Sequence, residues 1–446
     1  MAGLAQVEYH SSGVAHSVRT LSTYIRDHAW EASAGDLGGD GFEKPLIPAS
    51  VSDDAQHARR SILSHVSQIQ ILLEQPADFL QRLARQNQML ACLRWLSEYQ
   101  VLACIPLQGG VPSNDVAVLL GVPESQLVRI VQMTATEGFL CQPEPGKLAH
   151  TALSAPFVED PSLLDAALFL SEVAAPTAFQ MAAATRQWGP SSKGNETPYN
   201  IALNTSTAFS STCQQSPRIR RQWPSYLQYG MGDVEAGVTD VLTKLDWGSL
   251  GNSTIVDSTA TSVATATKLA TLHPSLRFFV QMSSIANSCE LSATLASRIV
   301  VQQRAAGAPQ QIRDAALFIV RLPVTSQVSS SRVSGELNAH IGVLSVNPRA
   351  RLLLVIPSVL RDAGGGTGTE IEVQARLRDL TFWQLTNEGE LEMEALIGLI
   401  SGVRDGAGQL AIVNKFAATH HPAVAFEIRY RTYAERAPQM QGSAHT

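Results

Sequence analysis

A run of small and hydroxyl-bearing residues follows the first strand that the sequence predicts in its C-terminal half. The strand covers Thr254–Asp257, and the next five residues are Ser258, Thr259, Ala260, Thr261 and Ser262. In α/β folds, a strand that ends on an acid and runs into a tight turn is a common place for a nucleotide-like ligand. Such a ligand lies against bare backbone, so the turn needs glycine, and this turn has none. Asp257 is equally well explained as a residue that caps the turn.

The second predicted strand of the same region ends on an amide. It covers Arg277–Gln281, about 20 residues after the first strand, where dinucleotide-binding folds place an acid that accepts the ribose hydroxyls. Gln281 can hydrogen-bond to hydroxyls, but without charge assistance it holds them less strongly than a carboxylate does. The two strand ends together predict a ligand site that has lost its main contacts.

Other residues that could do chemistry are isolated in the sequence. His340 falls inside a predicted helix, where packing or solvent exposure is its more common role. His420 and His421 lie beside Pro422 in a turn without a third metal ligand nearby, so we expect no metal site. The run Gly364–Gly368 resembles a phosphate cradle, but the next segment alternates like an extended chain and opens no helix, so we expect a flexible loop.

From residue 234 onward, the apolar pattern alternates between helix and strand. The predicted strands lie at 254–257, 277–281, 298–302, 315–321 and 352–356, and predicted helices separate all neighbouring pairs except 298–302 and 315–321. This order predicts an α/β domain with a doubly wound, Rossmann-like sheet. The last two predicted strands, 409–414 and 423–430, have no helix between them. We therefore expect an antiparallel hairpin at the sheet edge.

Residues 87–152 have the element order of a winged helix. A short helix at 113–120, a Gly-Val-Pro turn and a second helix at 124–137 precede a hairpin that ends near His150. Helices that read DNA carry several Arg, Lys or Asn side chains, whereas the second helix has Arg129 as its single basic residue. The module is therefore predicted to serve dimerisation or packing, and direct DNA reading is the less favoured alternative.

Composition and pattern divide the chain into five segments. Glycine, serine, aspartate and alanine dominate the N-terminal segment around residues 35–41, which predicts disorder there. The expected segments are a disordered arm at 1–55, a helical and winged-helix domain at 56–160, connecting helices and a loop at 161–233, the doubly wound domain at 234–433 and a flexible tail at 434–446.

Charge and cysteine content restrict the protein's surroundings and partners. The 446 residues carry a formal charge of -6, so no strong positive field is available to hold a phosphate backbone. The five cysteines are scattered, which favours a reducing compartment. Neither a signal peptide nor a membrane span is predicted. The basic runs Arg59-Arg60 and Arg218–Arg221 are thinner than typical nuclear import signals.

The winged helix, the doubly wound sheet and the terminal hairpin together resemble O-methyltransferases that use S-adenosylmethionine, over roughly residues 72–433. Several shorter runs resemble more closely the transcriptional coactivators encoded in fungal polyketide gene clusters, the aflatoxin cluster among them. These runs are Tyr99–Leu107, Met133–Leu140, His150–Phe157, Leu245–Trp247, Gln302–Ala305 and Phe318–Pro323.

The resemblance implies a methyltransferase fold without its chemistry. In the enzymes, the catalytic base is a histidine shortly after the fourth strand, and the matching residues 321–327 contain no histidine. We therefore expect no catalytic residue and no bound cofactor. The expected degenerate donor site consists of Asp257, Ser258, Thr259, Ala260, Thr261 and Gln281.

The resemblance also implies a role and a partner. It points to a coactivator that acts with a zinc-cluster transcription factor of the same gene cluster, in the nucleus and also in the cytoplasm. The long apolar helical faces between residues 62 and 101 favour a homodimer. No direct contact with nucleic acid or membrane is expected. Two alternatives stay open: an active O-methyltransferase for an aromatic polyketide, and direct promoter binding by the winged helix.

Overall fold

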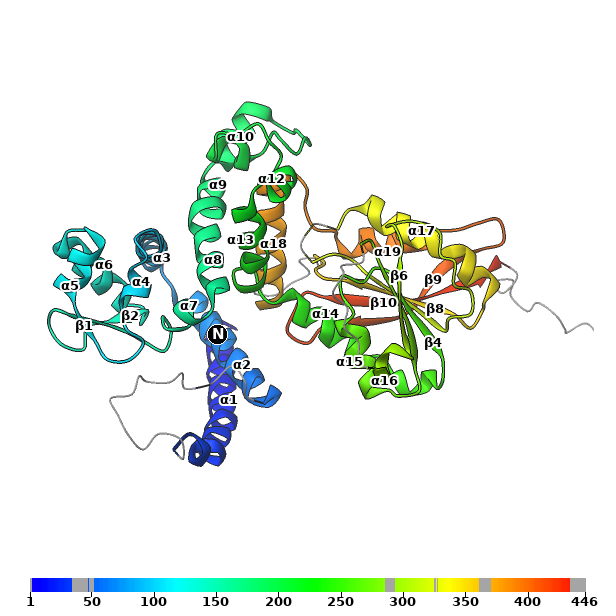
Figure 1. Cartoon of the computed structure of the whole chain (residues 1–446), viewed down its shortest axis with the longest axis horizontal. Coiled ribbons are helices and arrows are strands. Elements are labelled where there is room, and N and C mark those ends of the chain that lie inside the picture. The colour runs from blue at the N-terminus through cyan, green and yellow to red at the C-terminus, as the bar shows by residue number, and fades with distance from the viewer. Residues whose placement is uncertain are drawn as a thin grey trace, which may run out of the picture. The chain divides into compact units, whose positions relative to one another are not determined.

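The computed structural model describes residues 2–33, 47, 52–284, 293–324, 326, 328–360 and 370–433. The chain divides into two units, whose elements are labelled in Figure 1. The first comprises residues 1–187 and 198–230, and the second comprises residues 188–197 and 231–446. The second unit thus begins close to the predicted boundary at residue 234. Most of the predicted connecting segment belongs to the first unit.

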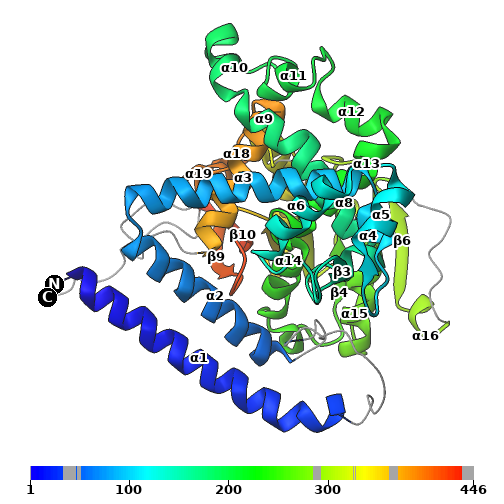
Figure 2. The same cartoon turned by 90° about the vertical axis from the view of Figure 1, so that its left-hand side faces the viewer.

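Two long helices that lie side by side begin the first unit (Figure 2). Helix α1 (Ala2–Ser33) runs antiparallel to α2 (Asp53–Leu73). Leu21 of α1 packs against Ala55 and Ala58 of α2 in a small apolar core. Small residues on α2 let the two helix backbones approach closely, so the pair forms a hairpin with its own core.

The prediction that residues 1–55 form a disordered arm is wrong for residues 2–33. The prediction applied the glycine-rich composition of residues 35–41 to the whole segment. That run itself lies outside the described residues. The first 33 residues instead place apolar side chains at helical spacing, and Tyr24 and Ile25 pack against the core of the hairpin. The predicted tail at 434–446 also lies outside the part of the chain that the structure describes.

The next elements of the first unit are four helices and a three-stranded sheet. The helices are α3 (Pro76–Glu98), α4 (Val101–Cys104), α5 (Ser113–Leu120) and α6 (Glu124–Ala135). The strands are β1 (Val111–Pro112), β2 (Leu140–Cys141) and β3 (Lys147–His150), in the sheet order β1-β3-β2. Gly121 adopts a φ of 66° between α5 and α6, where a left-handed residue ends one helix and redirects the chain.

A bundle of helices completes the first unit. Its helices are α7 (Pro156–Glu159), α8 (Pro161–Phe169), the π-helical turn η1 (Leu170–Ala174), α9 (Ala175–Phe179), α10 (Met181–Trp188), α11 (Pro198–Ala202), α12 (Phe209–Gln215) and α13 (Pro217–Tyr229). Its core is aromatic: the rings of Phe169 and Tyr226 stack with centroids 5.0 Å apart, and Trp223 lies 5.2 Å from Phe169. Large planar side chains thus hold α8 and α13 together.

One continuous helical stretch in the described part of the chain, Pro161–Phe179, meets the length and composition of a membrane span. The stretch carries Asp165 and Glu172, which form ion pairs with Arg221 and Arg218 of α13. Apolar helices at the core of a folded unit have the same composition, so length and composition are weak evidence for a span.

A seven-stranded sheet forms the centre of the second unit, in the order β6-β5-β4-β7-β8-β10-β9. Its strands are β4 (Thr254–Asp257), β5 (Arg277–Met282), β6 (Ile299–Gln303), β7 (Leu317–Arg321), β8 (Arg351–Ile356), β9 (Gly408–Ala417) and β10 (Val424–Thr432). The first five strands are parallel. The terminal pair is antiparallel, as predicted, and β10 lies between β8 and the edge strand β9.

Helices cover both faces of this sheet. The helices of the second unit are α14 (Val234–Thr243), the 3-10 turn η2 (Trp247–Leu250), α15 (Ala264–Leu272), α16 (Ala293–Ala296), α17 (Ser330–Val346), α18 (Glu370–Thr386) and α19 (Met393–Gly402). Neighbouring strand residues point to opposite faces: Ile255 enters a core with α14 and α15, whereas Val256 enters a core with α17 and α19. Burial on both faces explains why the central strands are continuous apolar runs.

Candidate functional site

A cavity of about 250 Å³ opens at the carboxyl ends of the parallel strands. It lies beside β4, which pairs with β5 on one side and with β7 on the other, so it occupies the point where the strand order reverses. Ligands of doubly wound folds bind at this position. Ser258, Thr259, Ala260 and Thr261 after β4 all line the cavity, as does Arg321 at the end of β7.

Asp257, the acid at the end of β4, is paired with an arginine of the same chain. Its side chain is almost fully buried, and its Oδ2 accepts from Nη2 of Arg321 over 2.6 Å. Nε of Arg321 lies 3.3 Å from Oδ1, and Nη1 donates to Oγ1 of Thr265 over 2.9 Å. Burial raises the pKa of Asp257, and the Arg321 charge opposes this shift. The carboxylate that a ligand would need is therefore already occupied.

The turn after β4 is held by hydroxyl groups in place of glycines. Thr259 Oγ1 accepts from the Arg321 N–H and donates to the Arg321 carbonyl, each over 2.7 Å. The Ser258 N–H donates to the carbonyl of Ile319 over 2.8 Å. No residue from 258 to 262 has a positive φ, so this turn closes without the left-handed conformation that favours glycine. Its hydroxyls tie β4 to β7.

Gln281, the predicted amide at the end of β5, is paired with a second amide. Its Nε2 donates to Oε1 of Gln310 over 3.1 Å, and its Oε1 accepts from Nε2 of Gln310 over 2.8 Å. Both side chains are buried. Oε1 of Gln310 also accepts from the backbone N–H groups of Gln311 and Ile312. Gln310 therefore uses the hydrogen-bonding groups that would face ribose hydroxyls.

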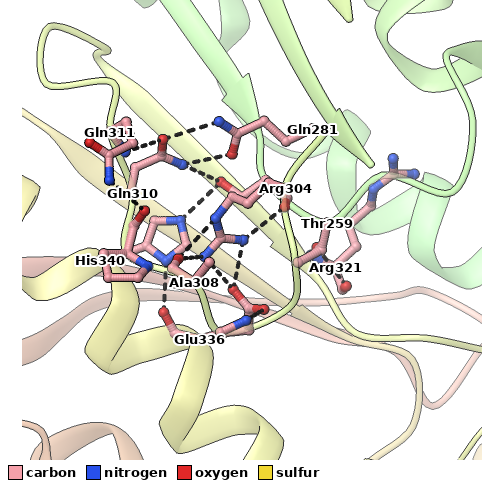
Figure 3. Close-up of polar contacts among 12 residues, drawn as sticks. Thr259, Gln281, Arg304, Ala308, Gln310, Gln311, Arg321, Glu336 and His340 are labelled. Carbon is pink, nitrogen blue, oxygen red and sulfur yellow. Dashed lines mark hydrogen bonds and ion pairs between the residues drawn. The ribbon is translucent and has the colours of Figure 1, made fainter. Parts of the chain in front are cut away.

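A second buried ion pair lies beneath the turn (Figure 3). Arg304, just after β6, contacts Oε2 of Glu336 on α17 through Nη1 and Nη2, over 3.1 and 3.0 Å. Nη1 of Arg304 also donates to the carbonyl of Ser258 over 3.0 Å. The Gly307 N–H donates to Oε1 of Glu336 over 2.6 Å. Both charges are thus fully hydrogen-bonded, which is what a buried pair requires.

His340 lies in the packed interior behind the same turn. Its Nδ1 is 2.7 Å from the carbonyl of Glu336, which can only accept, so Nδ1 carries the proton. Nε2 therefore accepts from the Ser258 hydroxyl, over 2.9 Å. Burial lowers the pKa of His340 to about 4, and the Arg304 charge adds to this shift. The ring is neutral near pH 7 and has no free nitrogen for a substrate.

The remaining sequence candidates do not join this site. His421 is buried in the turn between β9 and β10. Among the described residues, no group of three or more His, Cys, Asp or Glu side chains is arranged to hold a metal ion. The run Gly364–Gly368 and Cys289 lie outside the described residues, and so do Thr325 and Gln327 of the stretch that lacks a catalytic histidine.

Sequence reasoning placed the residues after β4 and β5 at this site but missed Arg304, Gln310, Arg321 and Glu336. A signal for one of them was present. Arg321 stands at the carboxyl end of a predicted parallel strand, and Asp257 ends the neighbouring one. Opposite charges at adjacent strand ends are expected to pair. Gln310 gave no such signal, because it lies in a loop of irregular structure.

Comparison with protein families supports the resemblance found in the sequence. Residues 4–74, which include most of the α1–α2 hairpin, match the model of the trypacidin cluster transcriptional coactivator tpcD N-terminal domain. The chain is 41% identical to the monodictyphenone cluster transcriptional coactivator mdpA of Emericella nidulans, over 97% of this chain and 99% of that protein. It is 38% identical to the aflatoxin cluster transcriptional coactivator aflS of Aspergillus parasiticus, over 86% of this chain and 91% of that protein.

Solved structures with the same fold include methyltransferases. OxaC superposes with a TM-score of 0.59 at 16% identity, over 95% of this chain and all of that chain. The mitomycin 7-O-methyltransferase MmcR superposes with a TM-score of 0.56 at 17% identity, over 80% of this chain and 98% of that chain. At such identities the likeness concerns the fold alone. The full-length relatives carry the assignment: this chain belongs to the family of secondary-metabolite cluster transcriptional coactivators.

Proposed function

We propose that this protein activates a secondary-metabolite gene cluster by binding another protein, on a methyltransferase fold that has lost its donor site. The observation that carries the proposal is the buried pair of Asp257 and Arg321. A ligand that used Asp257 would have to displace Arg321, and breaking a buried ion pair leaves an uncompensated charge. Gln310 fills the second contact position by pairing with Gln281.

The charge of the donor argues in the same direction. S-adenosylmethionine has a positively charged sulfonium, and Arg304 and Arg321 both line the cavity in which it would lie. The carboxylates of Glu336 and Asp257, which could offset the sulfonium charge, are already paired with these two arginines. The alternative, an active O-methyltransferase for an aromatic polyketide, requires donor binding despite these arginines and a base other than the neutral, buried His340.

The partner that we propose is a zinc-cluster transcription factor encoded in the same gene cluster. The curated relatives are named as coactivators, a role that requires a factor to act upon. The protein itself is poorly suited to hold DNA, because α6 carries Arg129 as its single basic residue and the formal charge is -6. We therefore propose that DNA is reached through the factor, with the protein in the nucleus as well as the cytoplasm.

A reporter assay tests this function. The promoter of a cluster gene drives luciferase in cells that express the zinc-cluster factor, this protein, both or neither. We expect this protein to raise the signal only together with the factor, and purified protein alone to leave the promoter DNA unshifted at physiological salt. Activation without the factor, together with a shift of promoter DNA by the pure protein, would support direct promoter binding by the winged helix instead.

We further propose that the protein is a homodimer, because α2 and the start of α3 expose a row of large apolar side chains. Leu63 and Leu73 of α2 are 55% and 63% exposed, and Leu80 of α3 is 65% exposed. An ion pair between Glu74, just after α2, and Arg82 of α3 joins the two helices near these side chains. Several large apolar side chains exposed on two successive helices favour an interaction site there.

Light scattering on Leu63→Gln and Leu73→Gln measures the oligomeric state. We expect a dimer for the natural sequence and a monomer for the double variant. Leu119→Gln is the matched control, because Leu119 on α5 is also strongly exposed but lies far from this row in the sequence. A monomeric natural protein, or a double variant that stays dimeric, contradicts the proposal.

A further inference from the structure

The cavity at the strand ends has a basic lining that the coactivator role does not use. Three arginines line it, Arg304, Arg321 and Arg332, together with a single carboxylate, that of Glu235. Arg304 and Arg321 are held in place by Glu336 and Asp257. Arg332, an exposed residue of the first turn of α17, forms no ion pair within the described residues.

The two buried arginines differ in how many of their N–H donors form hydrogen bonds. A guanidinium has five N–H donors. Arg304 directs hydrogen bonds to Ala308, Ser258 and Glu336 that engage every one of its nitrogens, with five contacts in total. Within the described residues, Arg321 makes three, two to Asp257 and one to Thr265. Two N–H donors of Arg321 therefore have no partner among these residues, on a side chain that is only 10% exposed and lines the cavity.

Apolar side chains also line the cavity. They come from Val238 of α14 and from Leu322, Pro323 and Val324 after β7. A cavity of about 250 Å³ is just below the usual range for small-molecule sites, so it suits a compact ligand. The lining thus combines fixed cationic donors with apolar side chains.

We propose that this cavity binds a small organic acid, with a flat apolar body between Val238 and Leu322 and a carboxylate that accepts hydrogen bonds from Arg321 and Arg332. A carboxylate matches the planar guanidinium geometry and accepts the charge-assisted hydrogen bonds that these two arginines can donate. The ligand class is opposite in charge to a sulfonium-bearing methyl donor. The inference goes beyond the coactivator function, because protein binding at another surface needs no ligand here.

The test uses benzoate as the probe and benzamide as its uncharged isostere, with the full-length protein. Binding is measured by isothermal titration and by the shift of the thermal unfolding midpoint. We expect benzoate to raise the midpoint and to bind about tenfold more tightly than benzamide, because a charge-assisted contact is lost in the amide. Equal affinities for the two probes, or no binding of benzoate, would overturn the proposal.

Substitution of Arg332 locates the binding. Arg332→Gln removes an exposed charge at the cavity, so the fold should persist while benzoate affinity falls about tenfold and benzamide affinity stays unchanged. Arg349→Gln is the matched control, an exposed arginine just beyond the opposite end of α17. An Arg332 variant that binds benzoate as the natural protein does contradicts the site. The reporter assay is a separate readout, so failure here and failure of the coactivator function are distinguishable.

Discussion

The guanidinium of Arg321 and the carboxylate of Asp257 form a buried ion pair across the ends of the adjacent strands β7 and β4, with Nη2 and Oδ2 2.6 Å apart. The pair occupies the place where a doubly wound fold ordinarily receives its ligand. It converts a binding position into a structural contact. The stability of the second unit should therefore depend on residues that serve ligand binding in an enzyme of this fold.

Removing one member of this pair should destabilise the protein strongly. Arg321→Met leaves Asp257 buried and uncompensated, so we expect the free energy of unfolding to fall by about 3–5 kcal/mol. The double variant Arg321→Met with Asp257→Leu removes both charges and should recover most of the loss. Urea unfolding followed by circular dichroism measures both. A single variant as stable as the natural protein would show that the pair carries no structural role.

The hydroxyl of Thr259 should contribute to stability through its two bonds to the Arg321 backbone. Thr259→Val keeps the shape but removes both bonds and leaves the backbone groups of Arg321 without a partner, so we expect a loss of about 1–3 kcal/mol. Thr261→Val is the control, because Thr261 lies two residues further along the same turn and is exposed. The same urea titration applies, and equal effects of the two substitutions would count against the assigned role of Thr259.

Stability should fall in mild acid because of His340. Its pKa is about 4 in the folded protein and 6.5 in the unfolded chain, so the unfolded state takes up a proton first as the pH falls below 6.5. The contribution of His340 to the free energy of unfolding is therefore fully present above pH 6.5. It falls by up to about 3 kcal/mol as the pH decreases to 4.

Comparison of the natural protein with His340→Gln isolates this contribution, since other groups titrate equally in both. The difference in unfolding free energy between pH 7 and pH 5 should be smaller in the variant. If the two proteins lose the same stability over this interval, the buried neutral state of His340 is not the cause.

Gly13 of α1 lies directly against the ring of His65 on α2. A Cβ at this position would come within 2.3 Å of the ring, whereas a Cβ at Gly3 meets nothing within 4 Å. We expect Gly13→Ala to destabilise the hairpin by about 1–3 kcal/mol through overpacking. Gly3→Ala should be neutral or slightly stabilising, because alanine favours a helix more than glycine does. Hydrogen exchange of the α1 amides compares the two variants. Equal protection in both would contradict the close approach of Gly13 to the His65 ring.

Much of the fold was predictable because it follows from periodicity. The alternation of apolar runs predicted the strands of the second unit and the terminal hairpin, since strands buried on both faces must be continuously apolar. The glycine-rich run at 35–41 misled the prediction for α1. A composition average over 55 residues hid a helix whose partner, α2, begins only at Asp53, beyond the glycine-rich run.

The site was predictable only in part. The absence of glycine after β4 and the amide at Gln281 predict a changed ligand position, because both are local substitutions in a known pattern. The replacement contacts are not local. Arg321 reaches back 64 residues to Asp257, and Gln310 reaches 29 residues to Gln281, so only the folded sheet brings them together.

The most direct test of the account is a calorimetric titration of the full-length protein with S-adenosylmethionine and S-adenosylhomocysteine, with folding verified by circular dichroism in the same samples. Because Arg321 and Gln310 already use Asp257 and Gln281, we expect no heat of binding up to millimolar concentrations of either compound. Saturable binding in the micromolar range would contradict a closed donor site and would direct attention to methyl transfer onto aromatic polyketides.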